Sequence, residues 1–189
     1  MIEIPCVIFA GGKSSRMGED KALLPFKSYP TLTQFQYERL KKIFKNVYIS
    51  CKTSDKFDFK AEFIEDTKTD NIYAPTAGFT AIFDALHVKH IFVLSVDTPF
   101  VEKEQIEKIL EHKDKGFDAI IAQTPHGIHP MCGLYARSLH VGFKNMLKYN
   151  QHKLGVLLQN SNTLYVHFED ENFFFNLNKR EEYEKAISD

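Results

Sequence analysis

Residues 7–21 read VIFAGGKSSRMGEDK, and this stretch decides which kind of nucleotide fold the chain can form. A short, β-rich apolar run leads directly into Gly11 and Gly12. A buried strand is therefore expected to end in a tight turn whose backbone can approach a ligand closely. The turn also contains three cations, namely Lys13, Arg16 and Lys21. Cations and exposed backbone N–H groups attract anions, so a polyphosphate suits this turn, and a solvated basic loop is the alternative.

Two common phosphate-binding motifs do not fit the same stretch. A Walker A motif ending at Gly12-Lys13-Ser14 would need glycine at position 7, where the chain has Val7. A dinucleotide fingerprint needs the spacing GxGxxG, whereas the glycines here are residues 11, 12 and 18. The sequence therefore excludes a P-loop and a dinucleotide-binding turn.

Length and charge limit the classes of protein that the chain can represent. A chain of 189 residues is long enough for one domain with a sizeable core, so one domain is expected over residues 1–189. The 24 basic side chains face 25 acidic ones, a balance that predicts neither a nucleic-acid nor a membrane partner. The three cysteines form no CxxC pair, which favours a reducing, cytoplasmic location.

Apolar runs alternate with helical patterns along the chain. Strands are expected at residues 4–9, 46–51, 63–65, 90–96, 118–122, 132–136 and 164–168. Helices are expected at residues 32–44, 79–86, 106–110, 138–149, 153–159 and 180–187. This alternation predicts βαβ units and a largely parallel sheet. Ligands of such sheets bind beyond the carboxyl ends of the strands, where the sequence places Gly11, Gly12, Ser50 and Asp97.

The glycine turn resembles a known family signature. Residues 10–21, AGGKSSRMGEDK, are similar to the LAGGxSxRMGxDK loop of the molybdenum cofactor guanylyltransferases, with Phe9 where the family has leucine. Further resemblances are FIED at 63–66, YAPTAG at 73–78, SVDTPF at 95–100, HP at 129–130, GLY at 133–135 and FNLN at 175–178. The departures are Ala74, Thr76 and the pair Lys179-Arg180, which replaces Thr-Pro after the last motif.

The resemblance implies both a fold and a reaction. The implied fold is a three-layer α/β/α Rossmann-like sandwich with a mostly parallel sheet, of the nucleotide-diphospho-sugar transferase type. The implied reaction joins GTP to Mo-molybdopterin, giving molybdopterin guanine dinucleotide and pyrophosphate, with Mg²⁺ as the cofactor. Molybdoenzyme chaperones or other cofactor-biosynthesis proteins are further expected partners.

The resemblance also implies roles for particular residues. The expected nucleotide contacts are Phe9, Ala10, Gly11, Gly12, Lys21, Ser50, Asp66, Gly78 and Asp97. The expected catalytic residues are Arg16, Lys21 and Asp97, with Asp97 also holding Mg²⁺. The expected acceptor-binding residues are His129, Asn176 and Asn178. Ser50 stands where the family often has asparagine.

The chemistry of these residues agrees with such a reaction, although each has a structural alternative. Nucleotidyl transfer needs alignment and charge neutralisation rather than a nucleophilic side chain. Asp97 could instead cap a helix that starts near Pro99, and Asp66 could be a turn residue. Asn176 and Asn178 alternate in an extended stretch and so share one face, or they close a turn before the last helix.

Three functions remain open at this point. The first is guanylyl transfer. The second is a related transferase that uses CTP or a sugar-phosphate acceptor, and the third is a non-catalytic GTP-binding module. The Ala10-Gly11-Gly12 turn and the stretch from Pro75 to Gly78 favour the guanine branch by resemblance. The HxxH pair of His126 and His129 has no third ligand nearby in the sequence, so a metal site there is not expected.

Overall fold

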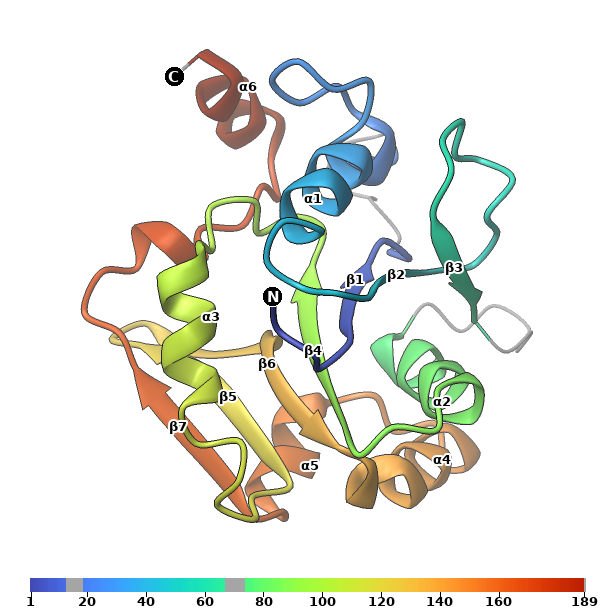
Figure 1. The fold of residues 1–189 in the computed structure, drawn as a ribbon, viewed down its shortest axis with the longest axis vertical. Coiled ribbons are helices and arrows are strands. Elements are labelled where there is room, and N and C mark those ends of the chain that lie inside the picture. The colour runs from blue at the N-terminus through green and yellow to red at the C-terminus, as the bar shows by residue number, and fades with distance from the viewer. Residues whose placement is uncertain (13–18, 67–73, 189) are drawn as a thin grey trace.

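A seven-stranded sheet forms the centre of the protein (Figure 1). The computed structural model describes residues 1–12, 19–66 and 74–188. Within these ranges the strand order is β3-β2-β1-β4-β6-β5-β7. The strands are β1 (Cys6–Phe9), β2 (Val47–Cys51), β3 (Glu62–Glu65), β4 (His90–Ser95), β5 (Ala119–Thr124), β6 (Gly127–Ala136) and β7 (Thr163–His167).

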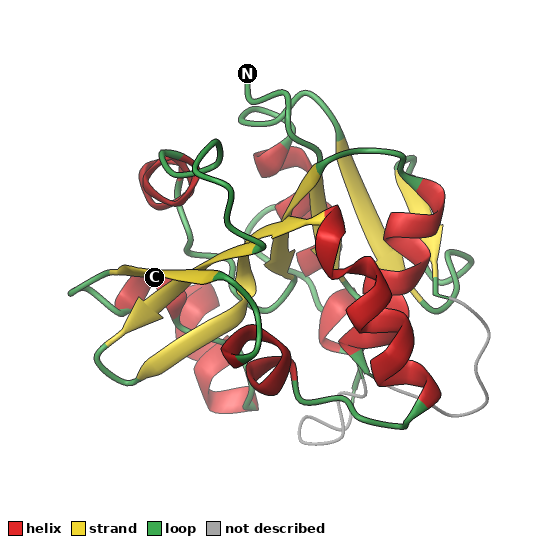
Figure 2. Cartoon of the chain, turned by 90° about the horizontal axis from the view of Figure 1, so that it is seen from below, coloured by secondary structure: helices red, strands yellow, loops and turns green. Residues whose placement is uncertain are grey.

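Helices cover both faces of this sheet and make three layers (Figures 1 and 2). The α-helices are α1 (Leu32–Leu40), α2 (Pro75–Ala85), α3 (Lys103–Leu110), α4 (His140–Lys148), α5 (Leu154–Gln159) and α6 (Arg180–Ser188). Short 3₁₀ turns are η1 (Lys21–Leu23), η2 (Arg137–Leu139) and η3 (Asn172–Phe174). Apolar side chains of α1, α3 and α6 belong to one core cluster, and those of α2, α4 and α5 belong to the other. The expected α/β/α sandwich is confirmed.

Alternation along the strands explains the two clusters. In β1, Cys6 and Ile8 belong to the cluster with α1 and α3, whereas Val7 and Phe9 belong to the cluster with α2 and α4. All four side chains are buried. Successive strand residues point to opposite faces, so a strand covered by helices on both sides must be apolar throughout. The uninterrupted apolar run before Gly11 is therefore the signature of a central strand.

The sheet is mostly parallel, but β6 runs against its neighbours. The pairs β1–β2, β1–β4, β2–β3 and β5–β7 are parallel, while β6 is antiparallel to both β4 and β5. The strand expected at 132–136 begins earlier, at Gly127, because β5 and β6 form a hairpin with Thr124 opposite Gly127. Gly127 has a φ of 136°, a backbone conformation that favours glycine. His129 and Pro130 consequently lie in a strand.

Three expected helix boundaries are wrong for identifiable reasons. Helix α2 begins at Pro75 rather than at Phe79, because proline suits the first helical position, whose N–H has no partner in any case. Helix α1 ends at Leu40 rather than at residue 44, because the chain turns over residues 41–43. Helix α3 begins at Lys103 behind Glu102, so Asp97 does not cap it.

The direction of the chain changes beside β1. From β1 the chain passes to β2 and β3 on one side, and it then returns to place β4 on the other side. Helix α1 follows β1 over one face of the sheet, and α2 precedes β4 over the opposite face. Open α/β sheets bind ligands at such a switch point, in the crevice beyond the carboxyl ends of the strands. The carboxyl ends of β1 and β4 are therefore where a ligand site is expected.

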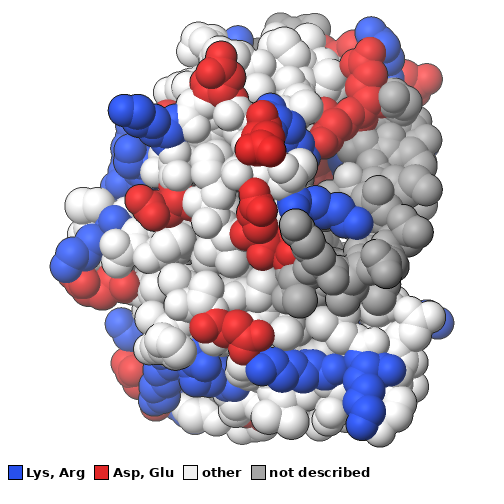
Figure 3. Space-filling model, turned by 90° about the vertical axis from the view of Figure 1, so that its right-hand side faces the viewer, with Lys and Arg blue, Asp and Glu red and all other residues white. Residues whose placement is uncertain are grey.

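Among the described residues of the face shown in Figure 3, acidic and basic side chains are interspersed, and basic ones gather along its lower edge. In the part of the chain that the structure describes, no helix has the length and apolar character needed to cross a bilayer.

Candidate active site

Two adjoining cavities open at the carboxyl ends of β1 and β4. The first has a volume of about 210 Å³, and its lining includes Ala10, Gly11, Gly12, Lys21 and Asp97. The second has a volume of about 250 Å³, and its lining includes Asp97, His129, Asn176 and Asn178. Ser95, Asp97 and Met131 line both. The fold thus gathers most of the residues predicted for nucleotide and acceptor around one carboxylate.

An ion pair between Lys21 and Asp97 occupies the centre of the crevice. The Lys21 Nζ lies 2.6 Å from Asp97 Oδ2 and donates to Asn178 Oδ1 at 3.1 Å. The Ser95 hydroxyl donates to the other Asp97 oxygen, Oδ1, at 2.6 Å. The side chains of Lys21 and Asp97 are 18% and 16% exposed. Both charges are therefore partly desolvated but still accessible from the crevice.

The Lys21 side chain is placed by a short capped turn. Asp20 caps η1, and its Oδ1 accepts a hydrogen bond from the backbone N–H of Ala22 at 3.1 Å. The buried Thr33 hydroxyl donates to the Ala22 carbonyl at 2.7 Å, which ties this turn to the first turn of α1. These two bonds fix the backbone from which the Lys21 amine reaches Asp97.

A buried glutamine that the sequence analysis missed places the segment bearing Asp97. The Gln36 side chain on α1 is fully buried, and its amide donates to the carbonyls of Thr98 at 3.1 Å and Val96 at 3.4 Å. The Arg39 guanidinium donates to Gln36 Oε1 at 2.5 Å and orients that amide. The turn after β4 is thus fixed from beneath by α1, and no local motif around Gln36 indicates this.

The residues predicted for the nucleoside meet on the other side of the glycine turn. The Ser50 hydroxyl at the end of β2 donates to Asp66 Oδ1 at 3.2 Å. A Cβ atom on Gly78 would lie 2.7 Å from Phe9 Cε1 and 2.8 Å from Ser50 Oγ. Gly78 lies in the first turns of α2, and its lack of a side chain lets that helix approach β1 and β2 closely. These four residues, Phe9, Ser50, Asp66 and Gly78, therefore form one compact group.

The residues predicted to bind the acceptor, His129, Asn176 and Asn178, also line one cavity. The His129 ring stacks on Phe174, with centroids 5.0 Å apart, and its Nε2 lies 3.1 Å from Thr124 Oγ1. Burial lowers the pKa of His129, which favours the neutral form of the ring. The backbone N–H of Asn178 donates to Glu182 Oε2 at 2.7 Å. Asn178 therefore lines the cavity and also closes the turn before α6. The two alternatives given for it, a residue of the acceptor site and a turn residue, are compatible.

The structure places the HxxH pair but not Arg16. The HxxH pair separates, because the exposed His126 pairs with Glu171, whereas His129 faces Thr124. Arg16, the third predicted catalytic residue, lies outside the described residues.

Comparisons with known proteins show the family to which the chain belongs. The model of the MobA-like NTP transferase domain matches residues 6–163. A molybdenum cofactor guanylyltransferase of Campylobacter jejuni subsp. jejuni is 45% identical over 99% of this chain and 97% of that protein. The chain belongs to the molybdenum cofactor guanylyltransferase family. A family member from Helicobacter pylori strain J99 is 35% identical, over 97% of this chain and 88% of that protein.

Solved structures of lower identity share the fold of this guanylyltransferase family member. Molybdopterin-guanine dinucleotide biosynthesis protein A from Archaeoglobus fulgidus superposes with a TM-score of 0.82 at 22% identity, over 98% of this chain and 97% of that one. The 2-C-methyl-D-erythritol 4-phosphate cytidylyltransferase from Thermus thermophilus gives a TM-score of 0.71 at 14% identity, over 100% and 98% of the chains. The fold is thus shared by proteins whose names specify different bases.

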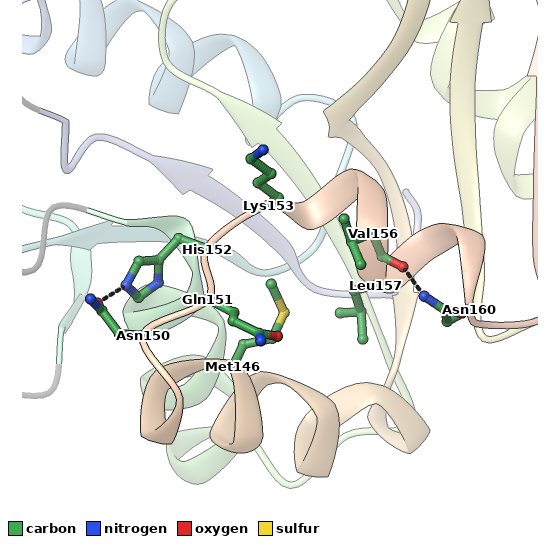
Figure 4. Close-up of a pocket in the computed structure, with 8 residues that line it drawn as sticks. All are labelled: Met146, Asn150, Gln151, His152, Lys153, Val156, Leu157 and Asn160. Carbon is green, nitrogen blue, oxygen red and sulfur yellow. Dashed lines mark hydrogen bonds between the residues drawn. The ribbon is translucent and has the colours of Figure 1, made fainter.

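A larger cavity of this guanylyltransferase family member lies elsewhere, between α4 and α5 (Figure 4). Its volume is about 560 Å³, and none of the predicted site residues lines it. At its edge His152 contacts the Asn150 side chain at 2.7 Å and Thr76 Oγ1 at 2.9 Å. Apolar side chains such as Met146, Val156 and Leu157 supply much of the wall, so this cavity does not suit a polyphosphate. The smaller crevice at β1 and β4 remains the candidate active site.

The ionisation of Asp66 differs clearly from that of an exposed aspartate. Burial raises its pKa from 3.8 to about 6, although Ser50, Lys52 and Lys56 oppose this effect. Because the folded value is the higher one, the protonated carboxyl stabilises the fold below about pH 4, and that contribution is lost as the pH rises through about 6. At pH 7.5 the ionised carboxylate therefore costs stability.

Asp66→Asn should consequently stabilise the protein at pH 7.5 and weaken its binding of GTP. The full pKa difference corresponds to about 3 kcal/mol, and hydration of the partly exposed carboxylate reduces the expected gain to about 1–2 kcal/mol. Urea unfolding at pH 7.5 and pH 4.5 measures this gain, which should shrink at the lower pH. A gain of equal size at both pH values, or a loss at pH 7.5, would contradict the assignment.

Proposed function

We propose that this chain transfers the guanylyl group of GTP to Mo-molybdopterin and releases pyrophosphate. The observation that carries the proposal is the position of the Lys21–Asp97 pair. It stands beside the glycine turn, at the switch point of the sheet. The chain's 45% identity to a molybdenum cofactor guanylyltransferase over nearly its whole length names the reaction.

The proposed chemistry is one in-line displacement. A terminal phosphate oxygen of the acceptor attacks the α-phosphorus of GTP, the new P–O bond forms, and the bond to the bridging oxygen of pyrophosphate breaks. The chain's part is to align the two phosphates and to neutralise the charge that gathers on the leaving group. Lys21 is proposed to supply positive charge that neutralises the leaving pyrophosphate, and Arg16 is proposed to do the same from the glycine turn. His129, Asn176 and Asn178 are proposed to hold the acceptor.

The residues present fit a magnesium ion at Asp97. Mg²⁺ prefers oxygen ligands and commonly takes only one or two carboxylates, with phosphates and water completing its shell. In the described part of the chain no group of three His, Cys, Asp or Glu side chains is placed to hold a metal. Asp97 alone would therefore supply the protein ligand, and the nucleotide would bring the rest. When bound, the ion would neutralise phosphate charge and hold the triphosphate in line.

The same geometry implies an exchange of partners on binding. Lys21 and Asp97 compensate each other across 2.6 Å. A triphosphate would bring negative charge for Lys21 and, with its metal, positive charge for Asp97. Two pairs with the ligand would then replace the ion pair, and neither side chain would be left as an uncompensated charge.

Two alternative functions stay distinguishable. The fold alone does not choose the base, since a cytidylyltransferase shares it at 14% identity. A binding module without catalysis would keep the nucleoside group around Asp66 but would not need a cation beside Asp97.

The free, buried Cys6, Cys51 and Cys132 fit a reducing compartment, and we propose the cytoplasm as the place of reaction.

Incubation with Mo-molybdopterin, Mg²⁺ and one nucleotide at a time tests the proposal. Mass analysis should detect molybdopterin guanine dinucleotide with GTP, accompanied by one pyrophosphate per product. CTP, ATP and UTP should give at most traces. Product with CTP alone would assign the chain to the cytidylyl branch, and GTP binding without pyrophosphate from any acceptor would leave only a binding module.

A further inference from the structure

A lysine outside the predicted set reaches the end of β1. Lys56 lies in the segment between β2 and β3, and its Nζ stands 2.6 Å from Asp20 Oδ2. The same amine donates to the Ala10 carbonyl at 3.3 Å. The side chains of Lys56 and Asp20 are 21% and 32% exposed. The amine therefore links a separate loop to the strand end and to the residue before Lys21.

The two carboxylate oxygens of Asp20 bind different partners. Oδ1 accepts the Ala22 N–H and caps η1, whose first residue is Lys21, while Oδ2 receives the Lys56 amine. The carboxylate is thus held from both sides. Any rotation that loosens Asp20 would also loosen the turn from which Lys21 extends toward Asp97.

The position of the Lys56 amine is itself fixed. It lies 5.0 Å from the centroid of the Phe57 ring, within the range of a cation–π contact. Burial raises the pKa of both Cys51 and Asp66, and the positive charge of Lys56 opposes that rise, so the charge acts on the nucleoside side of the glycine turn as well. Lys56 therefore acts on both parts of the site: on Asp66 through its charge and on the turn that bears Lys21 through Asp20.

We propose that Lys56 is a positioning residue of the nucleotide site, which orients Asp20 and the end of β1 so that the Lys21 amine meets the triphosphate. The expected effect of Lys56 on turnover rests on the proposed function, whereas its expected effect on GTP binding can be measured independently of that function. Lys56 is not assigned a contact with the ligand, because its amine already serves Asp20 and Ala10, and Asp20 rather than Lys56 lines the cavity.

Lys56→Met tests this role, with Lys60→Met as its matched control. Lys60 is an exposed cation of the same loop, so its loss removes an equal charge without touching Asp20. Lys56→Met should weaken GTP binding measured by calorimetry, and should lower kcat/KM for GTP, by about tenfold, the size expected for one charge-assisted hydrogen bond. KM for the acceptor should stay unchanged. Lys60→Met should behave like the unaltered protein, and Lys56→Arg should restore most of the loss.

A double-mutant cycle separates positioning from general stabilisation of the loop. Asparagine caps helices as well as aspartate does, so Asp20→Asn removes the ion pair and keeps the cap. If Lys56 acts through Asp20, the double variant Lys56→Met, Asp20→Asn should bind GTP no worse than Lys56→Met alone. Additive losses, an equal loss in Lys60→Met, or GTP binding by Lys56→Met within twofold of normal would overturn the proposal. If Lys56→Met does not fold, Asp20→Asn alone serves as the test, and normal GTP binding by that variant would overturn the proposal.

The two proposals fail in different ways. If the unaltered protein makes no dinucleotide although Lys56→Met weakens GTP binding, the proposed function is wrong and the positioning role stands. If the unaltered protein makes dinucleotide and Lys56→Met binds GTP normally, only the positioning role is wrong.

Discussion

Asp97→Asn is expected to lower the rate of pyrophosphate release by at least about 10²–10³-fold, the loss seen when one preorganised electrostatic contact to a transition state is removed. The substitution keeps the shape of the side chain and removes the charge that we propose for the metal. The Ser95 and Lys21 contacts can persist to an amide oxygen, but a neutral amide is a far weaker ligand for Mg²⁺ than a carboxylate. Initial rates at saturating Mg²⁺ and GTP measure the effect.

The same variant should fold almost normally. The Lys21 amine would keep its hydrogen bond to Asn178 and its access to the crevice, so the free energy of unfolding should change by no more than about 1–2 kcal/mol. Asp84→Asn is the matched control, because Asp84 also pairs with a lysine but lies on α2 away from the crevice. Normal turnover by Asp97→Asn, or an equal loss in Asp84→Asn, would be incompatible with a metal role for Asp97.

Lys21→Met is expected to weaken GTP binding and to lower kcat/KM by about 10²-fold. Lys21 is proposed to read phosphate charge and not the base. The variant should therefore bind guanosine as well as the unaltered protein does, whereas Asp66→Asn should bind both guanosine and GTP less well. Calorimetric titrations with the two ligands measure this difference.

Lys45→Met is the control for Lys21→Met. Lys45 pairs with Glu3 on an exposed part of the surface, so removing its charge tests whether a general change in net charge matters. Loss of guanosine binding in Lys21→Met would place Lys21 on the nucleoside side and refute its assigned role.

The parts of the site that the sequence predicted are those with a local signal. Gly11 and Gly12 follow a strand that is apolar throughout, and Asp97 follows a second such strand. Parallel strands next to each other in a sheet bring such ends to one edge, so the juxtaposition of Lys21 and Asp97 follows from the order of elements. The sequence did not, however, predict that the two side chains bond to each other.

The parts that the sequence could not predict depend on tertiary contacts. Gln36 sits in the middle of an ordinary helical pattern, and only the fold brings its amide under the carbonyls after β4. Lys56 is one of several cations in a polar loop, and nothing local distinguishes it from Lys60. An apolar run also does not encode strand direction, so the antiparallel β6 was not foreseen. The start of α2 was missed because Pro75 suits a turn as well as a first helical position.

The most direct measurement is a crystal structure with a non-hydrolysable GTP analogue and Mn²⁺, in which anomalous scattering locates the metal. We expect a metal peak at coordination distance from the Asp97 carboxylate, with the Lys21 amine transferred from Asp97 to a phosphate oxygen. A metal peak remote from Asp97, with the Lys21–Asp97 pair intact beside bound nucleotide, would contradict the proposed roles of both residues.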